Sequence, residues 1–451
     1  MSRNLIRTVL ILCTLFAART TLAEPRNLAD GTTVDRWTLP NGLEVVTRDV
    51  PGSRAISITW GYHFGLDHDP ADEPGLAWLL AEVAFTAPAG DTPGRTRDEM
   101  ESLRPQGWSL RVTRRQTLFN ETATTSQFPG VLHQIAGRMR GVTVTDAELR
   151  GSLATVRRTL GEWYFGAPDQ MLYWQVREYA RGLDKGGIVA LAAAKGLDHE
   201  TPASVQRAIA RAYAASNGVL VLAGALSSLD LRAIIASEFG ALPAGERLPA
   251  PPASRLDSVT VVLERPEVKT PMGVLGLVAP ALTDSLHPSF YMAMLVLGTE
   301  VKQGWDLPTP PLGTRFQYSL LDDPGFVRFY PPHDPKRVFG PSSITTILDE
   351  TVDELVQEIV QREVYDGLRY GMIWMMGGPM TRALAESVRQ DPAALNVLCT
   401  SLASQALWGN EEFWAEYRRR FGSTASPTFS FWANYLKDPR HHARLILAPG
   451  R

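Results

Sequence analysis

The reactive side chains of this sequence form no familiar catalytic or metal-binding signature. Two metal ligands on one helix face lie about four positions apart, and none of the eight histidines has such a relation to a second histidine. A Gly-x-Ser-x-Gly nucleophile elbow is absent. Cys399 lies in an apolar helical pattern, where we expect a buried and inert thiol. The histidines are His63, His68, His133, His199, His287, His333, His441 and His442.

An apolar segment with helical spacing begins at Gly75 and reads Gly-Leu-Ala-Trp-Leu-Leu-Ala-Glu-Val-Ala-Phe. Its leucines and Val83 recur with helical spacing, which predicts an amphipathic core helix over residues 75–87. Trp78 and Glu82 are four positions apart and therefore share one face of that helix.

This segment resembles the zinc-binding helix of the M16 (pitrilysin or insulinase type) metallopeptidases, Gly-Leu-Ala-His-Leu-Leu-Glu-His-Met-Leu-Phe. Trp78, Ala81 and Glu82 stand where that family has His, Glu and His. An indole offers only an N–H donor, and an alanine can neither accept nor deliver a proton. Zinc catalysis needs nitrogen or oxygen ligands and a base for the bound water. The resemblance therefore implies a non-catalytic homologue, with no catalytic residue and no cofactor, whereas its active relatives hold zinc.

A remnant cation site is the alternative for this motif. The resemblance places the third ligand of the family near Thr159, and the nearest carboxylate is that of Glu162. Glu82 with Glu162 would make a site of two carboxylates, which suits Mg²⁺ or Ca²⁺ weakly. We favour the simpler interpretation, in which Trp78 fills the vacated cavity and Glu82 is solvated or hydrogen-bonded.

The two halves of the sequence repeat one pattern of strands and helices. Alternating segments at 43–46 and 55–60 are matched by segments at 259–263 and 272–278. The segment from Tyr213 to Gly224 is likewise matched by the one from Tyr435 to Gly450. Helical patterns lie between these landmarks, at 96–105, 129–140, 146–163, 168–182, 202–213, 228–239, 286–299, 343–362, 366–388, 392–406 and 410–421.

The order of these elements extends the resemblance over nearly the whole chain. Leu39-Pro40-Asn41-Gly42 is similar to the opening of the first M16 strand, and Phe239-Gly240-Ala241-Leu242-Pro243 to a later helix exit. We expect an α+β fold of two homologous domains of the M16 (LuxS/MPP-like) type, each a mainly antiparallel sheet packed with helices, arranged as a half-clamp. The expected layout is a signal peptide at 1–23, domains at 24–243 and 257–451, and a proline-rich linker at 244–256.

Peptide contacts are implied by the resemblance alone. M16 members hold peptide against an edge strand, a form of strand addition, and the matching place here is Ser109-Leu110. In the second domain, the Arg and Tyr that grip the peptide in the family correspond to Arg315 and Tyr318, with altered spacing and inserted prolines. The alternative is a strand start with an exposed Arg315 and a packed Tyr318.

The N-terminus has the layout of a secretory signal peptide. Arg3 and Arg7 precede an apolar run from Thr8 to Ala18, and Thr21-Leu22-Ala23 provides small residues for cleavage. We therefore expect a periplasmic or secreted protein. The whole chain has 45 basic and 48 acidic residues, a balance that gives no indication of nucleic-acid binding.

Three functions fit these patterns. The first is an exported, catalytically inactive subunit that pairs with an active zinc-dependent M16 peptidase and helps form a chamber for unfolded or short peptides. The second is a stand-alone peptide-binding or envelope scaffold protein, and the third is a metallopeptidase with a non-standard site.

Overall fold

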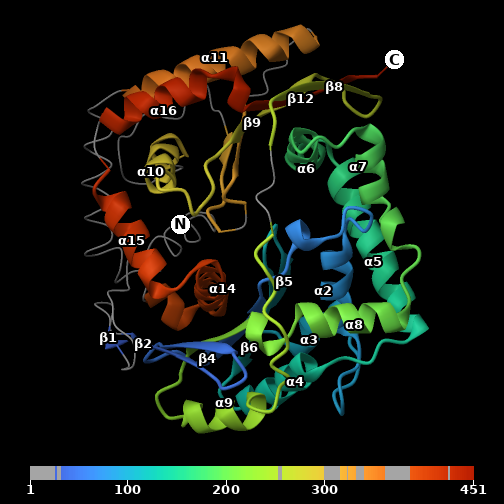
Figure 1. The fold of residues 1–451 in the computed structure, drawn as a ribbon, viewed down its shortest axis with the longest axis vertical. Coiled ribbons are helices and arrows are strands. Elements are labelled where there is room, and N and C mark those ends of the chain that lie inside the picture. The colour runs from blue at the N-terminus through green and yellow to red at the C-terminus, as the bar shows by residue number, and fades with distance from the viewer. Residues whose placement is uncertain are drawn as a thin grey trace. The chain divides into compact units, whose positions relative to one another are not determined.

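The computed structural model describes residues 26–27, 32–251, 256–298, 315–321, 323–331, 340–360, 386–424 and 427–450. Within the chain, two compact units can be distinguished (Figure 1). The first unit contains Met1–Val156, Gly196–Pro252 and Trp374–Ala415, and the second contains Arg157–Lys195, Ala253–Ile373 and Glu416–Arg451.

A seven-stranded sheet forms the centre of the first unit, in the order β1-β2-β3-β7-β4-β6-β5. β3 and β7 are parallel, and the other neighbours are antiparallel. The turn before β3 contains Gly42 at a φ of 88°, a conformation that glycine adopts without steric cost. The strands are β1 (Arg26–Asn27), β2 (Thr33–Thr38), β3 (Glu44–Asp49), β4 (Ala55–Tyr62), β5 (Trp108–Val112), β6 (Thr117–Thr124) and β7 (Gly218–Gly224).

Different helices cover the two faces of this sheet. On one face, Ala55 and Val221 pack with Leu395 and Cys399 of α14 (Pro392–Trp408). On the other face, Phe119 stacks on Phe85 of α2 (Leu76–Thr86), with ring centroids 6.2 Å apart. The remaining helices are η1 (Leu66–His68), α3 (Arg97–Leu103), α4 (Phe128–Arg140), α8 (Pro202–Ala212), η3 (Ala215–Asn217) and α9 (Leu231–Phe239), and α5 (Asp146–Phe165), η2 (Lys195–Leu197) and α15 (Glu411–Gly422) contribute residues to both units.

A five-stranded sheet forms the centre of the second unit, in the order β10-β11-β9-β12-β8. β8 and β12 are parallel, and the other neighbours are antiparallel. α6 contacts β8, β9 and β12, and α11 contacts β9 and β12. The elements are α6 (Pro168–Ala180), α7 (Lys185–Ala192), β8 (Val259–Arg265), β9 (Met272–Val278), α10 (His287–Gly298), β10 (Arg315–Gln317), β11 (Phe326–Tyr330), α11 (Pro341–Val360), α16 (Pro427–Lys437), η5 (Pro439–His441) and β12 (His442–Pro449).

The two sheets share one topology. The order β3-β7-β4-β6-β5 of the first sheet is repeated as β8-β12-β9-β11-β10 in the second, with the parallel pair at the same place. This correspondence confirms the duplication and the α+β fold of two homologous domains that the sequence predicts.

Each sheet is covered in part by a helix from the other half of the sequence. α14 comes from the C-terminal half and packs on β4, β6 and β7, whereas α6 comes from the N-terminal half and packs on the second sheet. The strands of the two sheets lie within residues 26–224 and 259–449, whereas the compact units exchange helices across that division, so the domain bounds at 24–243 and 257–451 stay a prediction. An apolar helix pattern shows which residues are buried, but it does not show which sheet they cover.

The predicted signal peptide at 1–23 and most of the helical pattern at 366–388 lie outside the described residues. Among the helices of the described ranges, none is long and apolar enough to cross a membrane.

Candidate functional site

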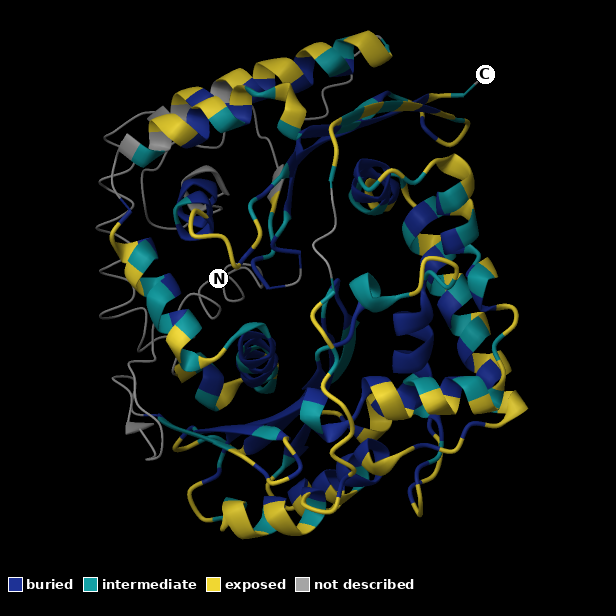
Figure 2. Cartoon of the chain, viewed as in Figure 1, coloured by how far each residue is buried: buried dark blue, intermediate teal, exposed yellow. Residues whose placement is uncertain are grey.

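The helix that carries Trp78, Ala81 and Glu82 is α2, and a carboxylate holds its N-terminus. Asp69 accepts hydrogen bonds from the backbone N–H of Gly75 at 2.7 Å and of Ala77 at 2.8 Å. An anion at this position satisfies free N–H groups and interacts favourably with the helix dipole. Gly75 itself has a φ of 95°, so the helix begins immediately after a residue in the left-handed region. Residues 76–85 are all buried (Figure 2).

The three motif positions offer no zinc site. Trp78 is buried and has no lone pair for a metal, and Ala81 is fully buried and has no polar atom. The Glu82 carboxylate is 5% exposed and is bound by the guanidinium of Arg97, the first residue of α3. Arg97 Nε lies 3.2 Å from Oε1 and 3.0 Å from Oε2, and Nη2 lies 2.5 Å from Oε2. A cation at Glu82 would have to displace this guanidinium, so the residues present do not fit the zinc of the family.

The other remnant candidate, Glu162, lies on α5 in the part of the chain that belongs to the second unit. Its side chain is 60% exposed and forms an ion pair with Arg158 at 3.6 Å. Glu82 and Glu162 thus each have an arginine partner within their own unit.

A buried network of charges, which no local sequence pattern predicts, lies at the other end of α2. The Glu121 carboxylate, with no exposed surface, contacts Arg95 at 2.7 Å and Arg104 at 2.5 Å. Burial alone would raise the pKa of Glu121, but the two guanidinium groups hold it below its ordinary value. Arg95 also donates to the Phe85 carbonyl at 2.9 Å, and Arg138 donates to the Ala87 carbonyl at 2.7 Å. Cations at these carbonyls complement the negative end of the α2 dipole.

The first peptide-binding prediction falls on an edge strand. Ser109 and Leu110 lie on β5, the last strand of the seven-stranded sheet, where they face Asn120 and Phe119 of β6. Trp108 of the same strand stacks on Phe85 of α2, with centroids 5.2 Å apart. The edge strand β5 therefore lies directly beside α2.

The second peptide-binding prediction falls on the equivalent strand of the repeat. Arg315 opens β10, which ends the second sheet as β5 ends the first. Tyr318 follows β10, and its hydroxyl contacts His287 Nε2 at 2.7 Å and the Pro324 carbonyl at 3.0 Å. His287 is fully buried, and its Nδ1 contacts the Tyr417 hydroxyl at 2.8 Å. The Tyr318 hydroxyl is thus engaged inside its own unit, as in the packed-tyrosine alternative.

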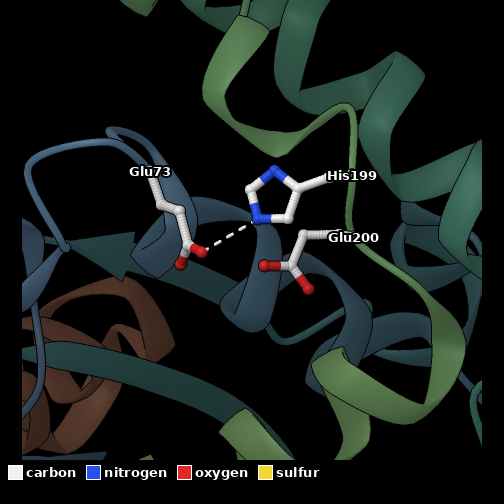
Figure 3. A group of neighbouring side chains, drawn as sticks. All are labelled: Glu73, His199 and Glu200. Atoms are coloured by element: carbon white, nitrogen blue, oxygen red, sulfur yellow. Dashed lines mark hydrogen bonds and ion pairs between the residues drawn. The ribbon is translucent and has the colours of Figure 1, made fainter.

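Sequence reasoning missed one group of potential metal ligands. Glu73, His199 and Glu200 each present a ligand atom, and these atoms lie within 4.8 Å of one another (Figure 3). His199 has no histidine partner at helical spacing, and 126 positions separate it from Glu73, so no local pattern signals the group. Only the tertiary fold shows it.

Comparisons with known proteins agree with this architecture. A protease from Helicobacter pylori superposes with a TM-score of 0.73 at 15% identity, covering 92% of this chain and 99% of that one. The peptidase M16 inactive domain from Pseudomonas fluorescens gives 0.65 at 16% identity, covering 93% and 98%. This chain has the M16 peptidase fold. The periplasmic protease PqqL from Escherichia coli gives a TM-score of 0.63 at 14% identity, and the match covers 96% of this chain but only 48% of PqqL. No protein-family model and no curated protein sequence matches the chain.

Proposed function

We propose that this protein is an exported, non-catalytic M16-type subunit that pairs with an active zinc-dependent M16 peptidase and helps form its peptide-binding chamber. The observation that carries the proposal is the ion pair between Glu82 and Arg97. Glu82 stands at the position of a zinc ligand in the family, but its carboxylate is already paired with a guanidinium. Ala81 stands at the position of the catalytic base. The loss of general-base assistance alone removes about 10² to 10⁴ in rate.

Two comparisons support a subunit of this kind. The Pseudomonas fluorescens domain with the same fold is described as inactive. PqqL is a periplasmic protease about twice as long as the region that matches this chain, which leaves room in PqqL for a second unit of similar size. We infer that this chain is one of two half-clamps that pair with each other, and that its partner is exported to the same compartment.

The edge of β5 is the surface that we propose for peptide. A terminal strand leaves one row of backbone N–H and C=O groups for an added strand. Ser109 and Leu110 lie on that strand, and the equivalent strand β10 carries Arg315. We assign Tyr318 the role of positioning the end of β10 through its bond to His287.

The pairing can be tested by light scattering coupled to size-exclusion chromatography. The chain is mixed with an M16 peptidase of the same organism that has an intact His-x-x-Glu-His motif, and peptide hydrolysis is followed in each peak. We expect a mixed dimer whose hydrolysis disappears when the motif glutamate of the partner is replaced. A chain that stays monomeric in the presence of that partner would exclude the pairing and favour the stand-alone scaffold.

Hydrolysis by the chain alone would instead favour the third function, a peptidase with a non-standard site. That function predicts that hydrolysis is sensitive to chelators and is lost in Glu162→Ala. Glu162→Gln in the mixed dimer is the matched control, since we expect it to leave hydrolysis unchanged.

A further inference from the structure

We propose that Glu73, His199 and Glu200 form a surface site for a divalent transition-metal ion such as Zn²⁺, separate from the α2 motif. One imidazole nitrogen and two carboxylates are a donor set that zinc accepts. Their ligand atoms lie within 4.8 Å of one another. His199 Nε2 and Glu73 Oε1 are 3.0 Å apart, close to the separation of about 3.3 Å between two ligands at 2.0–2.1 Å from a tetrahedral ion.

The backbone holds the two contributing segments together. Glu73 precedes α2, whereas His199 and Glu200 lie between η2 and α8. Gly196 of η2 makes the approach possible, because a Cβ there would lie 2.9 Å from Pro74 Cδ and closer still to the Asp72 carbonyl oxygen. The convergence of the three side chains therefore follows from close packing of two main-chain segments (Figure 3).

A neighbouring residue orients one of the ligands. The Ser204 hydroxyl donates a hydrogen bond to Glu200 Oε2. Ser204 is itself fixed in the first turn of α8, where its N–H donates to the Thr201 hydroxyl at 3.2 Å. Hydrogen bonds of this kind hold a ligating carboxylate in place and leave its second oxygen for the ion.

The charge of the group favours a cation. With a neutral imidazole, the three side chains carry two negative charges, and the His199 side chain is 62% exposed, so an ion can reach it from solvent. Three protein ligands leave a fourth position for water. Because Glu73, His199 and Glu200 all belong to the first unit, the bound ion would tie the segment before α8 to the N-terminal end of α2.

His133 provides a matched control. It is also an exposed histidine between two acids, but Glu238 contacts its Nδ1 at 3.0 Å and Asp91 contacts its Nε2 at 3.7 Å. Because the two acids lie at opposite nitrogens of the ring, they cannot both bind an ion that is held by one of those nitrogens. His133→Ala should therefore remove a similar exposed contact between a histidine and a carboxylate without affecting metal binding.

The test is titration of the untagged full chain with Zn²⁺ by isothermal calorimetry, with the bound ions counted by native mass spectrometry. We expect one Zn²⁺ per chain, affinity reduced at least about 100-fold in His199→Ala and in Glu73→Gln, and unchanged affinity in His133→Ala and Glu82→Gln. Absence of stoichiometric Zn²⁺, or equal affinity in His199→Ala, would overturn the site.

Loss of binding in Glu82→Gln would place the ion at α2. That result would contradict both this site and the structural role of Glu82. Failure of the His199 site alone leaves the proposed function untouched, because pairing and hydrolysis are measured separately.

Discussion

Glu82 should act as a structural residue whose removal costs stability and changes no metal content. Breaking a buried ion pair by removing one partner costs about 3–5 kcal/mol, whereas exposed pairs contribute about 0–1 kcal/mol. The Glu82 side chain is 5% exposed and that of Arg97 is 34% exposed, so the pair lies between these limits. We expect Glu82→Gln to lower the free energy of unfolding by about 2 kcal/mol.

A double-mutant cycle in urea isolates the pair. The cycle compares the wild type with Glu82→Gln, Arg97→Gln and the double variant. We expect a coupling energy of about 1–2 kcal/mol, because each single substitution already breaks the bidentate contact between the two side chains. Glu162→Gln is the control, and its exposed pair with Arg158 at 3.6 Å should contribute less than about 1 kcal/mol. A coupling energy near zero, or a change in bound metal in Glu82→Gln, would refute the assignment of Glu82 to the fold.

Three further outcomes are expected. Glu121→Gln should lower the free energy of unfolding by about 3–5 kcal/mol, because it leaves two buried guanidinium groups without their carboxylate; a loss below about 1 kcal/mol in urea would show that the network is not structural. Burial raises the pKa of Cys399 to about 11, so the native thiol should not react with a disulfide reagent at pH 8 and should react fully in denaturant; rapid native labelling would contradict its burial. Burial lowers the pKa of His287 from 6.5 to about 4, so the unfolded chain takes up a proton first, and stability should fall as pH drops from 6.5 toward 4. Wild type should lose about 2–3 kcal/mol more than His287→Gln between pH 7 and pH 4.5, and equal losses in the two proteins would contradict a buried neutral imidazole.

Much of the fold follows from local patterns in the sequence. The segment predicted at 75–87 is the helix Leu76–Thr86, and those predicted at 146–163 and 392–406 are Asp146–Phe165 and Pro392–Trp408. These helices have long apolar faces, which is the strongest local signal. The duplication was visible because each copy keeps the same alternating strands.

Two helices of the described residues have no clear local signal in the sequence. Lys185–Ala192 contains two glycines in its first turn, and Pro427–Lys437 is rich in aromatic residues and has few strong helix formers. Tertiary packing decides their conformation, so intrinsic propensity could not predict them.

For the site, the sequence predicts residue types but not the contacts that they make. The types of Trp78 and Ala81 alone exclude the zinc chemistry of the family, but the partner of Glu82 is 15 positions away in another helix. The contacts between Glu73 and His199 and between Glu121 and Arg104 likewise join segments that no local periodicity connects. Such contacts arise from the packing of whole elements.

The most direct measurement is peptide hydrolysis by the purified chain over a broad peptide library, with added Zn²⁺ and then with chelator. We expect no hydrolysis in either condition, and any bound Zn²⁺ should persist in Glu82→Gln and disappear in His199→Ala. Chelator-sensitive hydrolysis by the chain alone, lost in Glu82→Gln, would contradict the proposal that the α2 motif does not support catalysis.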